Sequence, residues 1–195
     1  MILPIVAYGD PILRKVAKEI DANYPNLSEL IENMRQTMYN ASGVGIAAPQ
    51  IGKSIRLFLI DATPFAEDED LSEEDRAQLK DFNKVFINPR IIEENGDEWA
   101  FNEGCLSIPD IREEVFRPDT VTFCYQDENF KDHKVTLTGI AARVFQHEYD
   151  HLEGILFTDK LSSLKKRILK KKLEKISLGK VSSNYRMRFP NLKKR

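Results

Sequence analysis

The chain of 195 residues has few of the residues that stabilise small secreted proteins or anchor a protein in a membrane. It contains only two cysteines, which leaves no disulfide framework. No apolar run approaches the roughly 20 residues that a membrane helix needs. Residues 1–8 lack the basic region and the longer apolar region of a signal peptide. We therefore expect a soluble, cytoplasmic protein with one substantial core and no membrane partner.

The formal net charge is only −2, but the charges are unevenly distributed along the chain. Residues 160–195 contain 14 Lys or Arg and one acidic residue, which leaves 15 basic and 30 acidic residues in 1–159. The sequence thus divides into an acidic body, 1–160, and a basic helix and tail, 161–195. Within the body, residues 62–83 are strongly acidic and are expected to form an exposed insertion of unknown role.

The basic segment predicts an amphipathic helix at 161–176. Its apolar residues are expected near one face: Leu161, Leu164, Ile168 and either Leu169 or Leu173. Such a helix either packs on the body through its leucines or presents its lysines to an RNA surface. Residues 180–195 are expected to be loosely ordered.

Histidine is also scarce, and two of the three histidines lie close together. His147 and His151 are four positions apart, with Glu148 between them. On a helix this spacing places both imidazoles on one face, where they can hold a metal ion, with Glu148 beside it as a general base. The alternative is a chance occurrence of this short motif on an exposed helix. The third histidine, His133, is predicted to be an exposed turn residue.

A catalytic metal site usually has three protein ligands, so another must come from elsewhere in the chain. No histidine follows His151, and Phe157 stands where one metalloprotease motif places its third histidine. Cys105, in a predicted loop or strand edge, is the best candidate, because a thiolate binds zinc or iron well. Alone, such a cysteine would more often be an inert small side chain. Cys124 lies in an alternating segment and is predicted to be a packing residue.

Residues 43–52 form a third unusual segment, with glycines at 43 and 45. Glycines so placed suit a backbone that adopts positive φ or closely approaches another group. The segment does not fit a dinucleotide-binding loop, because it follows a predicted helix and has Ala48 at the third glycine position. By itself the segment is equally well explained without a function, as a helix end followed by a turn in which Gln50 is only a polar loop residue.

Three segments together resemble, in order, the three signature motifs of peptide deformylases. They are Gly-Val-Gly-Ile-Ala-Ala-Pro-Gln at 43–50, Glu-Gly-Cys-Leu-Ser at 103–107 and Gln-His-Glu-Tyr-Asp-His at 146–151. The resemblance implies a hydrolase that removes the formyl group from N-formylmethionine of newly synthesised polypeptides and releases formate. It also implies one divalent metal ion, with Fe(II) expected and Zn, Ni or Co as alternatives.

The same resemblance assigns the catalytic roles. The implied metal ligands are Cys105, His147 and His151. A metal lowers the pKa of a bound water, and Glu148 would take the proton from that water and later hand a proton to the departing amine. The side-chain amide of Gln50 and the backbone N–H of Leu106 would stabilise the tetrahedral oxyanion.

The residues expected to contact substrate are spread over several segments: Val44, Gly45, Glu103, Gly104, Arg112, Ile140 and Val144. The glycines suit a backbone that pairs with an extended peptide. Val44, Ile140 and Val144 match the family's pocket for the methionine side chain, although core packing also explains the last two. Arg112 either lies near the substrate or is a solvated charge at a strand end.

The remaining pattern predicts an α+β fold. Helices are expected at 25–42, ended by Gly43, at 139–152 with Thr138 as N-cap, and at 72–81 with a capping box at Ser72. Strands are expected at 55–61, 84–92, 115–126 and 133–138. Antiparallel and mixed β-sheets should surround a central metal-binding helix, followed by the basic C-terminal helix.

Two other functions remain compatible with the sequence. A metallopeptidase would need a third ligand other than Cys105. A metal-stabilised RNA-binding or ribosome-binding protein would have no need of Glu148. The presence of Glu148 with only three evident ligands favours an open, catalytic site.

Overall fold

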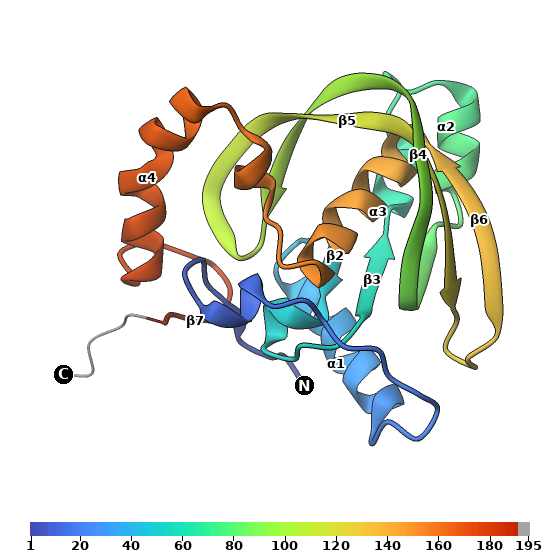
Figure 1. Cartoon of the computed structure of the whole chain (residues 1–195), viewed down its shortest axis with the longest axis horizontal. Coiled ribbons are helices and arrows are strands. Elements are labelled where there is room, and N and C mark those ends of the chain that lie inside the picture. Colours follow the sequence, from blue (N-terminus) through green and yellow to red (C-terminus); the bar gives the residue numbers. More distant parts are fainter. Residues whose placement is uncertain (191–195) are drawn as a thin grey trace.

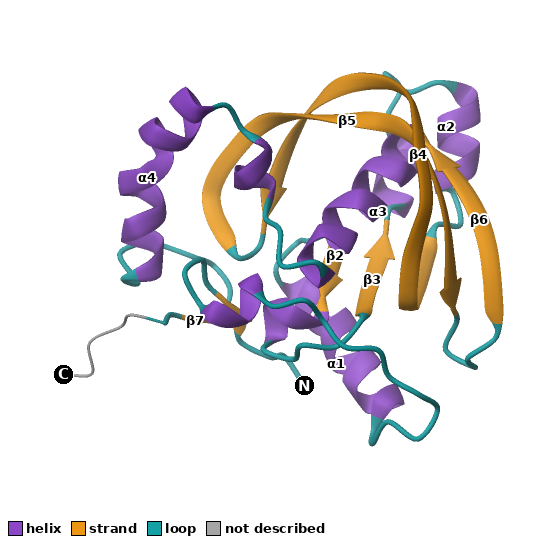
Figure 2. Cartoon of the chain, in the orientation of Figure 1, coloured by secondary structure: helices purple, strands orange, loops and turns teal. Residues whose placement is uncertain are grey.

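The computed structural model describes residues 1–190. Its helices are α1 (Leu27–Asn40), α2 (Glu73–Leu79), α3 (Gly139–Leu152) and α4 (Ser163–Ser177). Its strands are β1 (Ile5–Val6), β2 (Gly45–Ala47), β3 (Leu57–Asp61), β4 (Asn83–Cys105), β5 (Ile108–Gln126), β6 (Asp132–Thr138) and β7 (Met187–Arg188). Short 3-10 helices occur at Pro11–Arg14, Ala48–Ile51, Thr63–Glu67 and Phe157–Lys160. Figure 2 shows these helices and strands in one view.

A five-stranded antiparallel sheet in the order β2-β3-β4-β5-β6 forms the body of the protein. Its two longest strands, β4 and β5, form a hairpin that closes where Cys105 pairs with Ile108. The pairing shifts register at four points, and such bulges bend strands. Figure 1 shows the curved hairpin arching over α3. A second, parallel sheet pairs β1 with β7, so the predicted α+β class is confirmed.

Helix α3 occupies the centre of the molecule, and its bounds are those that the sequence predicts. Its buried face includes Phe145, whose ring stacks on Phe123 with centroids 3.7 Å apart and meets the rings of Phe58 and Phe86 at 5.3 Å. Burying aromatic surface of this size is a major source of folding free energy. The sheet and its aromatic core thus fix the position of the helix that carries both histidines.

Helix α1 packs apolar side chains against residues of β2, β3 and β4 in a second core cluster: Leu30, Ile31, Met34 and Met38. It begins two residues later and ends two residues earlier than predicted. Ser42, with φ of 53°, rather than Gly43 takes the left-handed conformation after the helix. The N–H of Gly43 donates to the carbonyl of Met38 at 2.9 Å, which closes the helix end.

Helix α4 packs on the body through Leu169, Leu173 and Ile176. Leu164 and Ile168 were expected on the same face as the packed leucine. This is wrong, because Leu164 and Ile168 are 57% and 63% exposed. The helix is therefore rotated relative to the predicted apolar stripe. The exposed face of α4 therefore carries two apolar residues, Leu164 and Ile168, among its basic residues.

The chain beyond α4 is more ordered than the sequence indicated. Its strand β7 pairs with β1, and Val181 and Phe189 pack against the cluster that anchors α4. The expectation of loose order at 180–195 is therefore wrong for residues 180–190. The rest of that segment, 191–195, lies outside the described residues.

The acidic segment 62–83 exposes most of its charges but is attached to the core. Ser72 is the N-cap of α2, and its hydroxyl accepts the N–H of Asp75 at 3.0 Å, as the capping-box pattern predicts. Leu79 and Phe82 are buried in the cluster around α3. Gln78 and Thr138 exchange two hydrogen bonds, at 3.0 and 3.3 Å, which tie α2 to the start of the central helix.

Candidate metal centre and active site

Cys105 lies at the tip of the β4–β5 hairpin, the strand edge that the sequence indicated. Leu106 and Ser107 form the turn between the two strands. Residues from distant parts of the chain hold this tip. The amide nitrogen of Gln50 lies 3.4 Å from both Cys105 Sγ and Ser107 Oγ, and the N–H of Tyr8 donates to the Ser107 carbonyl at 2.8 Å.

His147 and His151 lie one turn apart on α3, with ring centroids separated by 5.2 Å. His151 Nε2 is 3.4 Å from Cys105 Sγ. One potential ligand atom from each of Cys105, His147 and His151 lies within 4.8 Å of the other two. This is the one such group in residues 1–190. The third histidine, His133, takes no part, since it lies in β6 and pairs with Asp127.

Glu103 orients one of these histidines. His147 Nδ1 donates to Glu103 Oε2 at 2.8 Å, which leaves the Nε2 lone pair for a metal ion. Burial opposes ionisation of Glu103, but hydrogen bonds from Arg117 and then from His147 outweigh it and hold its pKa well below the ordinary value. Glu103 lines the cavity, as expected of a substrate contact, but both carboxylate oxygens are engaged by protein groups.

Two buried arginines complete this charge network. Arg117 donates to Glu103 through two nitrogens, at 2.7 and 2.9 Å, and to Asp150 of α3 at 2.7 Å. Arg143 donates to Glu103 at 3.1 Å and lies over the Trp99 ring. Because these groups come from β4, β5 and α3, the network locks the hairpin onto the metal-binding helix. No local motif in the sequence indicated the two arginines.

Glu148 points into the site beside the histidines. It is 4% exposed, and its Oε2 has no hydrogen-bond partner among the described residues. Gly45 makes room for it, because a Cβ there would lie 2.3 Å from Glu148 Oε1. Burial raises the pKa of Glu148 to about 7, although nearby His147 acts in the opposite direction. A carboxyl group with this pKa can both accept and release a proton near neutral pH.

The residues present fit a divalent metal ion. A thiol and two imidazoles suit zinc, iron, cobalt or nickel. Burial, followed by the proximity of His147, lowers the pKa of His151 well below its usual value, which favours the neutral imidazole that binds metals. The unpartnered Glu148 oxygen beside this donor set is where a metal hydrolase needs its base.

Gln50 and Leu106 both line the cavity beside the Cys-His-His group. The Gln50 side chain is fully buried, and its oxygen accepts the N–H of Ala47 at 2.8 Å. This bond turns the amide nitrogen toward Cys105 and the cavity. Leu106 packs against Gly43, where a Cβ would lie 2.8 Å from Leu106 Cδ1. The glycine at 43 therefore allows the hairpin tip to approach.

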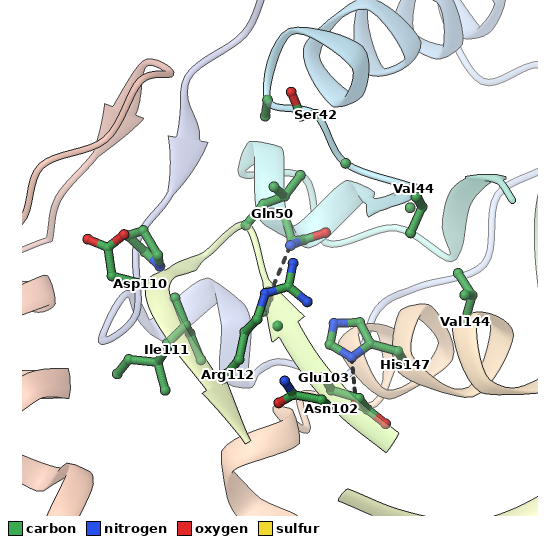
Figure 3. A pocket seen from close by; sticks show the side chains of 18 of the residues that line it. Ser42, Val44, Gln50, Asn102, Glu103, Asp110, Ile111, Arg112, Val144 and His147 are labelled. Atoms are coloured by element: carbon green, nitrogen blue, oxygen red, sulfur yellow. Dashed lines mark hydrogen bonds and ion pairs between the residues drawn. The ribbon is translucent and has the colours of Figure 1, made fainter. Parts of the chain in front are cut away.

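A cavity of about 920 Å³ opens in front of these groups. Val44 and Val144 line it, as Figure 3 shows, whereas Ile140 is not among its lining residues and belongs to the core. Core packing therefore accounts for Ile140. Arg112 lines the cavity with an exposed side chain that lies across Gly104, where a Cβ would be 3.2 Å from Arg112 Cγ.

The cavity has further lining residues that the sequence did not indicate: Phe65, Phe101, Asn102, Ser183, Asn184 and Tyr185. Phe65 belongs to the acidic segment, and the last three belong to the chain beyond α4. None lies in a recognisable motif. Their position depends on contacts between segments far apart in sequence, so no local pattern could have identified them.

A buried carboxyl group beside a Cys-His-His set at the wall of a cavity is typical of a hydrolase that activates water at a metal. The family of polypeptide deformylases matches residues 2–167 of this chain. The chain belongs to the polypeptide deformylase family, whose members act on N-formyl peptides.

Curated relatives and solved structures agree with this assignment. A peptide deformylase of Christiangramia forsetii is 64% identical over 194 residues, covering 100% of this chain and 99% of that protein. One of Flavobacterium johnsoniae is 59% identical with the same coverage. The crystal structure of a peptide deformylase from Legionella pneumophila superposes with a TM-score of 0.75 at 39% identity, covering 90% of this chain and 95% of that one. Among the described residues, no helix is long and apolar enough to cross a membrane.

Proposed function

We propose that this protein hydrolyses the N-formyl group of formylmethionine on newly made polypeptides in the cytoplasm and releases formate, with Glu148 as the general base. The observation that carries the proposal is the buried, unpartnered Glu148 carboxyl oxygen, which lies beside the Cys105, His147 and His151 group and lines the cavity. A structural metal site has no use for such a carboxyl group. This feature favours catalysis over a purely RNA-binding role.

Cys105, His147 and His151 would hold the metal, with Fe(II) expected and Zn, Ni or Co as alternatives. When bound, the metal supplies a water of lowered pKa and polarises the formyl oxygen. Three neighbouring thiol and imidazole donors suit such an ion and leave a position open for water. A metallopeptidase would need a third ligand other than Cys105, so a ligand role for Cys105 would argue against that function.

Glu148 would accept a proton from the attacking water at its carboxylate and return a proton to the nitrogen of the leaving amine. Its pKa of about 7 suits both steps. The Gln50 amide nitrogen and the Leu106 N–H would donate to the oxyanion that forms on the former formyl oxygen. The Gln50 amide is held before substrate binds, because its oxygen accepts the N–H of Ala47. Leu106 lies in the turn that closes the β4–β5 hairpin.

The substrate would bind as an extended strand beside β2. This strand is an edge of the five-stranded sheet, so one side of its backbone is free to pair with a peptide. Gly45 of β2 and Gly104 of β4 line the cavity without a side chain that would obstruct a peptide, and Val44 and Val144 offer apolar contact for the methionine side chain. Arg112, which lines the cavity and is exposed, is placed to contact the peptide farther from its formyl end.

The decisive test is formate release from formyl-Met-Ala-Ser by protein purified without oxygen and supplied with Fe(II). Glu148→Ala is the parallel variant. The proposal predicts turnover by the wild type and a loss of about 100-fold or more in kcat for the variant at equal metal content. Equal activity of the two proteins would rule out Glu148 as the base, and an inactive, metal-loaded wild type would refute the proposed reaction.

A contact with the ribosome is also proposed, through α4. Leu164 and Ile168 are exposed on this helix beside Lys165 and neighbouring lysines, and such a surface suits docking onto polyanionic RNA. Reversing the charges of Lys166, Lys170 and Lys171 to Glu should abolish co-sedimentation with ribosomes at low salt and leave formate release unchanged. Undiminished co-sedimentation of the variant would eliminate this contact.

A further inference from the structure

The chain after α4 returns to the body as a tail segment, defined here as residues 181–189. It lies beyond residues 2–167, the part that matches the deformylase family. The N–H groups of Ile5 and Ala7 donate to the carbonyls of Arg186 and Arg188, each at 2.9 Å. Val181, Met187 and Phe189 pack against the apolar cluster that includes Ile108 and the leucines of α4. The tail segment is therefore a fixed part of the body.

One residue of the tail segment reaches the active-site hairpin. The hydroxyl of Tyr185 donates to the carbonyl of Leu106 at 2.8 Å. The backbone of Tyr185 is held by Ser183, whose hydroxyl accepts the Tyr185 N–H at 3.3 Å and donates to the Tyr185 carbonyl at 3.1 Å. These two hydrogen bonds from Ser183 restrict the backbone that carries the Tyr185 ring.

The tip of the hairpin is where such a bond has most effect. Leu106 and Ser107 lie in the turn beyond the last pair of the strand ladder, so interstrand hydrogen bonds do not fix their peptide groups. Tyr8 holds the Ser107 carbonyl at 2.8 Å, and Tyr185 holds the Leu106 carbonyl. The two ends of the described chain thus hold the two consecutive carbonyls of the turn.

We propose that Tyr185 is a positioning residue for hydrolysis: its bond to the Leu106 carbonyl restrains the backbone at residue 106 and thereby limits rotation of the preceding peptide group, whose N–H is the proposed oxyanion donor. The inference rests on the proposed function, in which Leu106 N–H is an oxyanion donor. An oxyanion donor acts only when it points at the place where charge develops, so a loosened turn should affect the transition state more than the bound substrate. The neighbouring Ser183 and Asn184 line the same cavity, which places the tail segment at the substrate as well.

The test is Tyr185→Phe in the full-length, metal-loaded protein, with kcat and KM measured separately on formyl-Met-Ala-Ser. The variant removes only the donor, and we expect kcat to fall about three- to tenfold, the range of one lost hydrogen bond. KM should stay within about twofold. Tyr24→Phe is the matched control, because Tyr24 is also half-buried and its hydroxyl makes no hydrogen bond within the described residues. It should match the wild type.

Amide hydrogen exchange provides a readout independent of turnover. Peptides covering 103–108 should exchange faster in Tyr185→Phe than in the wild type, whereas peptides from α3 should be unchanged. An unchanged kcat in an active wild-type background overturns the positioning role. A raised KM at constant kcat also overturns the positioning role. A lowered kcat that accompanies metal loss or general unfolding overturns it as well. An inactive wild type would instead refute the proposed function, and exchange at 103–108 would still report on the Tyr185 bond.

Discussion

Gly45 offers the sharpest test of how the backbone positions the proposed base. A Cβ at residue 45 would lie 2.3 Å from Glu148 Oε1, 2.7 Å from its Cδ and 2.9 Å from its Cγ. Ordinary contacts of a Cβ begin at 3.4 Å, so Gly45→Ala requires a movement of about 1 Å. The backbone of β2 has little room to supply it, because Gly45 pairs with Ile60 of β3 and both residues are buried. The Glu148 carboxyl group must therefore move.

A displacement of this size at a catalytic group costs about 100-fold in rate. We expect Gly45→Ala to lower kcat for formate release by about that factor, with little change in metal content or melting temperature. Gly104→Ala is the matched substitution. There the new Cβ would meet Arg112 Cγ at 3.2 Å, and this exposed, flexible side chain can move aside. The decrease in kcat caused by Gly104→Ala should be at least tenfold smaller than the decrease caused by Gly45→Ala.

The assay is steady-state formate release by both variants, together with metal analysis and thermal unfolding. A Gly45→Ala protein that keeps kcat within about threefold of the wild type would refute the reasoning, since Glu148 would then tolerate displacement. A large loss that coincides with unfolding would show that the substitution perturbs β2 rather than the carboxyl group.

Four further predictions concern buried or bridging groups. Glu103→Gln leaves the buried Arg117 and Arg143 short of negative charge and should lower the free energy of unfolding by about 3 kcal/mol in urea. The same change should weaken metal binding about 10- to 100-fold in a chelator competition, because His147 loses its orienting carboxylate. Because the pKa of Glu103 lies below its ordinary value of 4.5, its ionisation stabilises the fold above about pH 4.5, and that stabilisation is lost as the pH falls further. In metal-free protein the wild type should therefore lose more stability between pH 5 and 2 than Glu103→Gln, and parallel curves would contradict this. Gln78→Ala breaks the reciprocal pair with Thr138 and should cost about 1 kcal/mol in urea unfolding, while kcat is unchanged.

The structure departs from the sequence-based predictions where long-range contacts override local pattern. Strands were predicted at 84–92 and 115–126, but β4 runs from Asn83 to Cys105 and β5 from Ile108 to Gln126. The additional residues include a polar, exposed stretch around Asn95 and Gly96, in which apolar and polar residues do not alternate as in a typical strand. Residues 93–98 take strand conformation because they pair with 118–122 across the hairpin, and residues 99–105 because they pair with 108–117. No single segment reveals this pairing.

The face of α4 and the order of the tail segment were mispredicted for a related reason. The helical spacing of the leucines allowed more than one apolar face, and contact with Ile108 and Val115 of β5 selects the one with Leu169 and Leu173. The tail segment has no regular apolar spacing, and it is ordered because β1 offers it a partner. Both outcomes depend on surfaces supplied by the rest of the chain.

The sequence by itself determined the central helix and the chemistry that it carries. Four-residue spacing of histidines, a glutamate between them and an apolar stripe are local properties of one helix, so His147, Glu148 and His151 were identifiable without any tertiary contact. Ser72 as the start of α2 was local in the same way. Such features need only the geometry of a few consecutive residues.

Tertiary structure alone decided how that chemistry is held in place. Cys105 meets His151 across 46 positions of sequence, and Glu103 engages His147 across 44. Tyr185 reaches the Leu106 carbonyl across 79. Each of these contacts exists because the curved hairpin closes over α3 while the two ends of the described chain pair beneath its tip. The physical reason is that hydrogen bonds and ion pairs between distant segments depend on the packing of the whole chain, which no local spacing encodes.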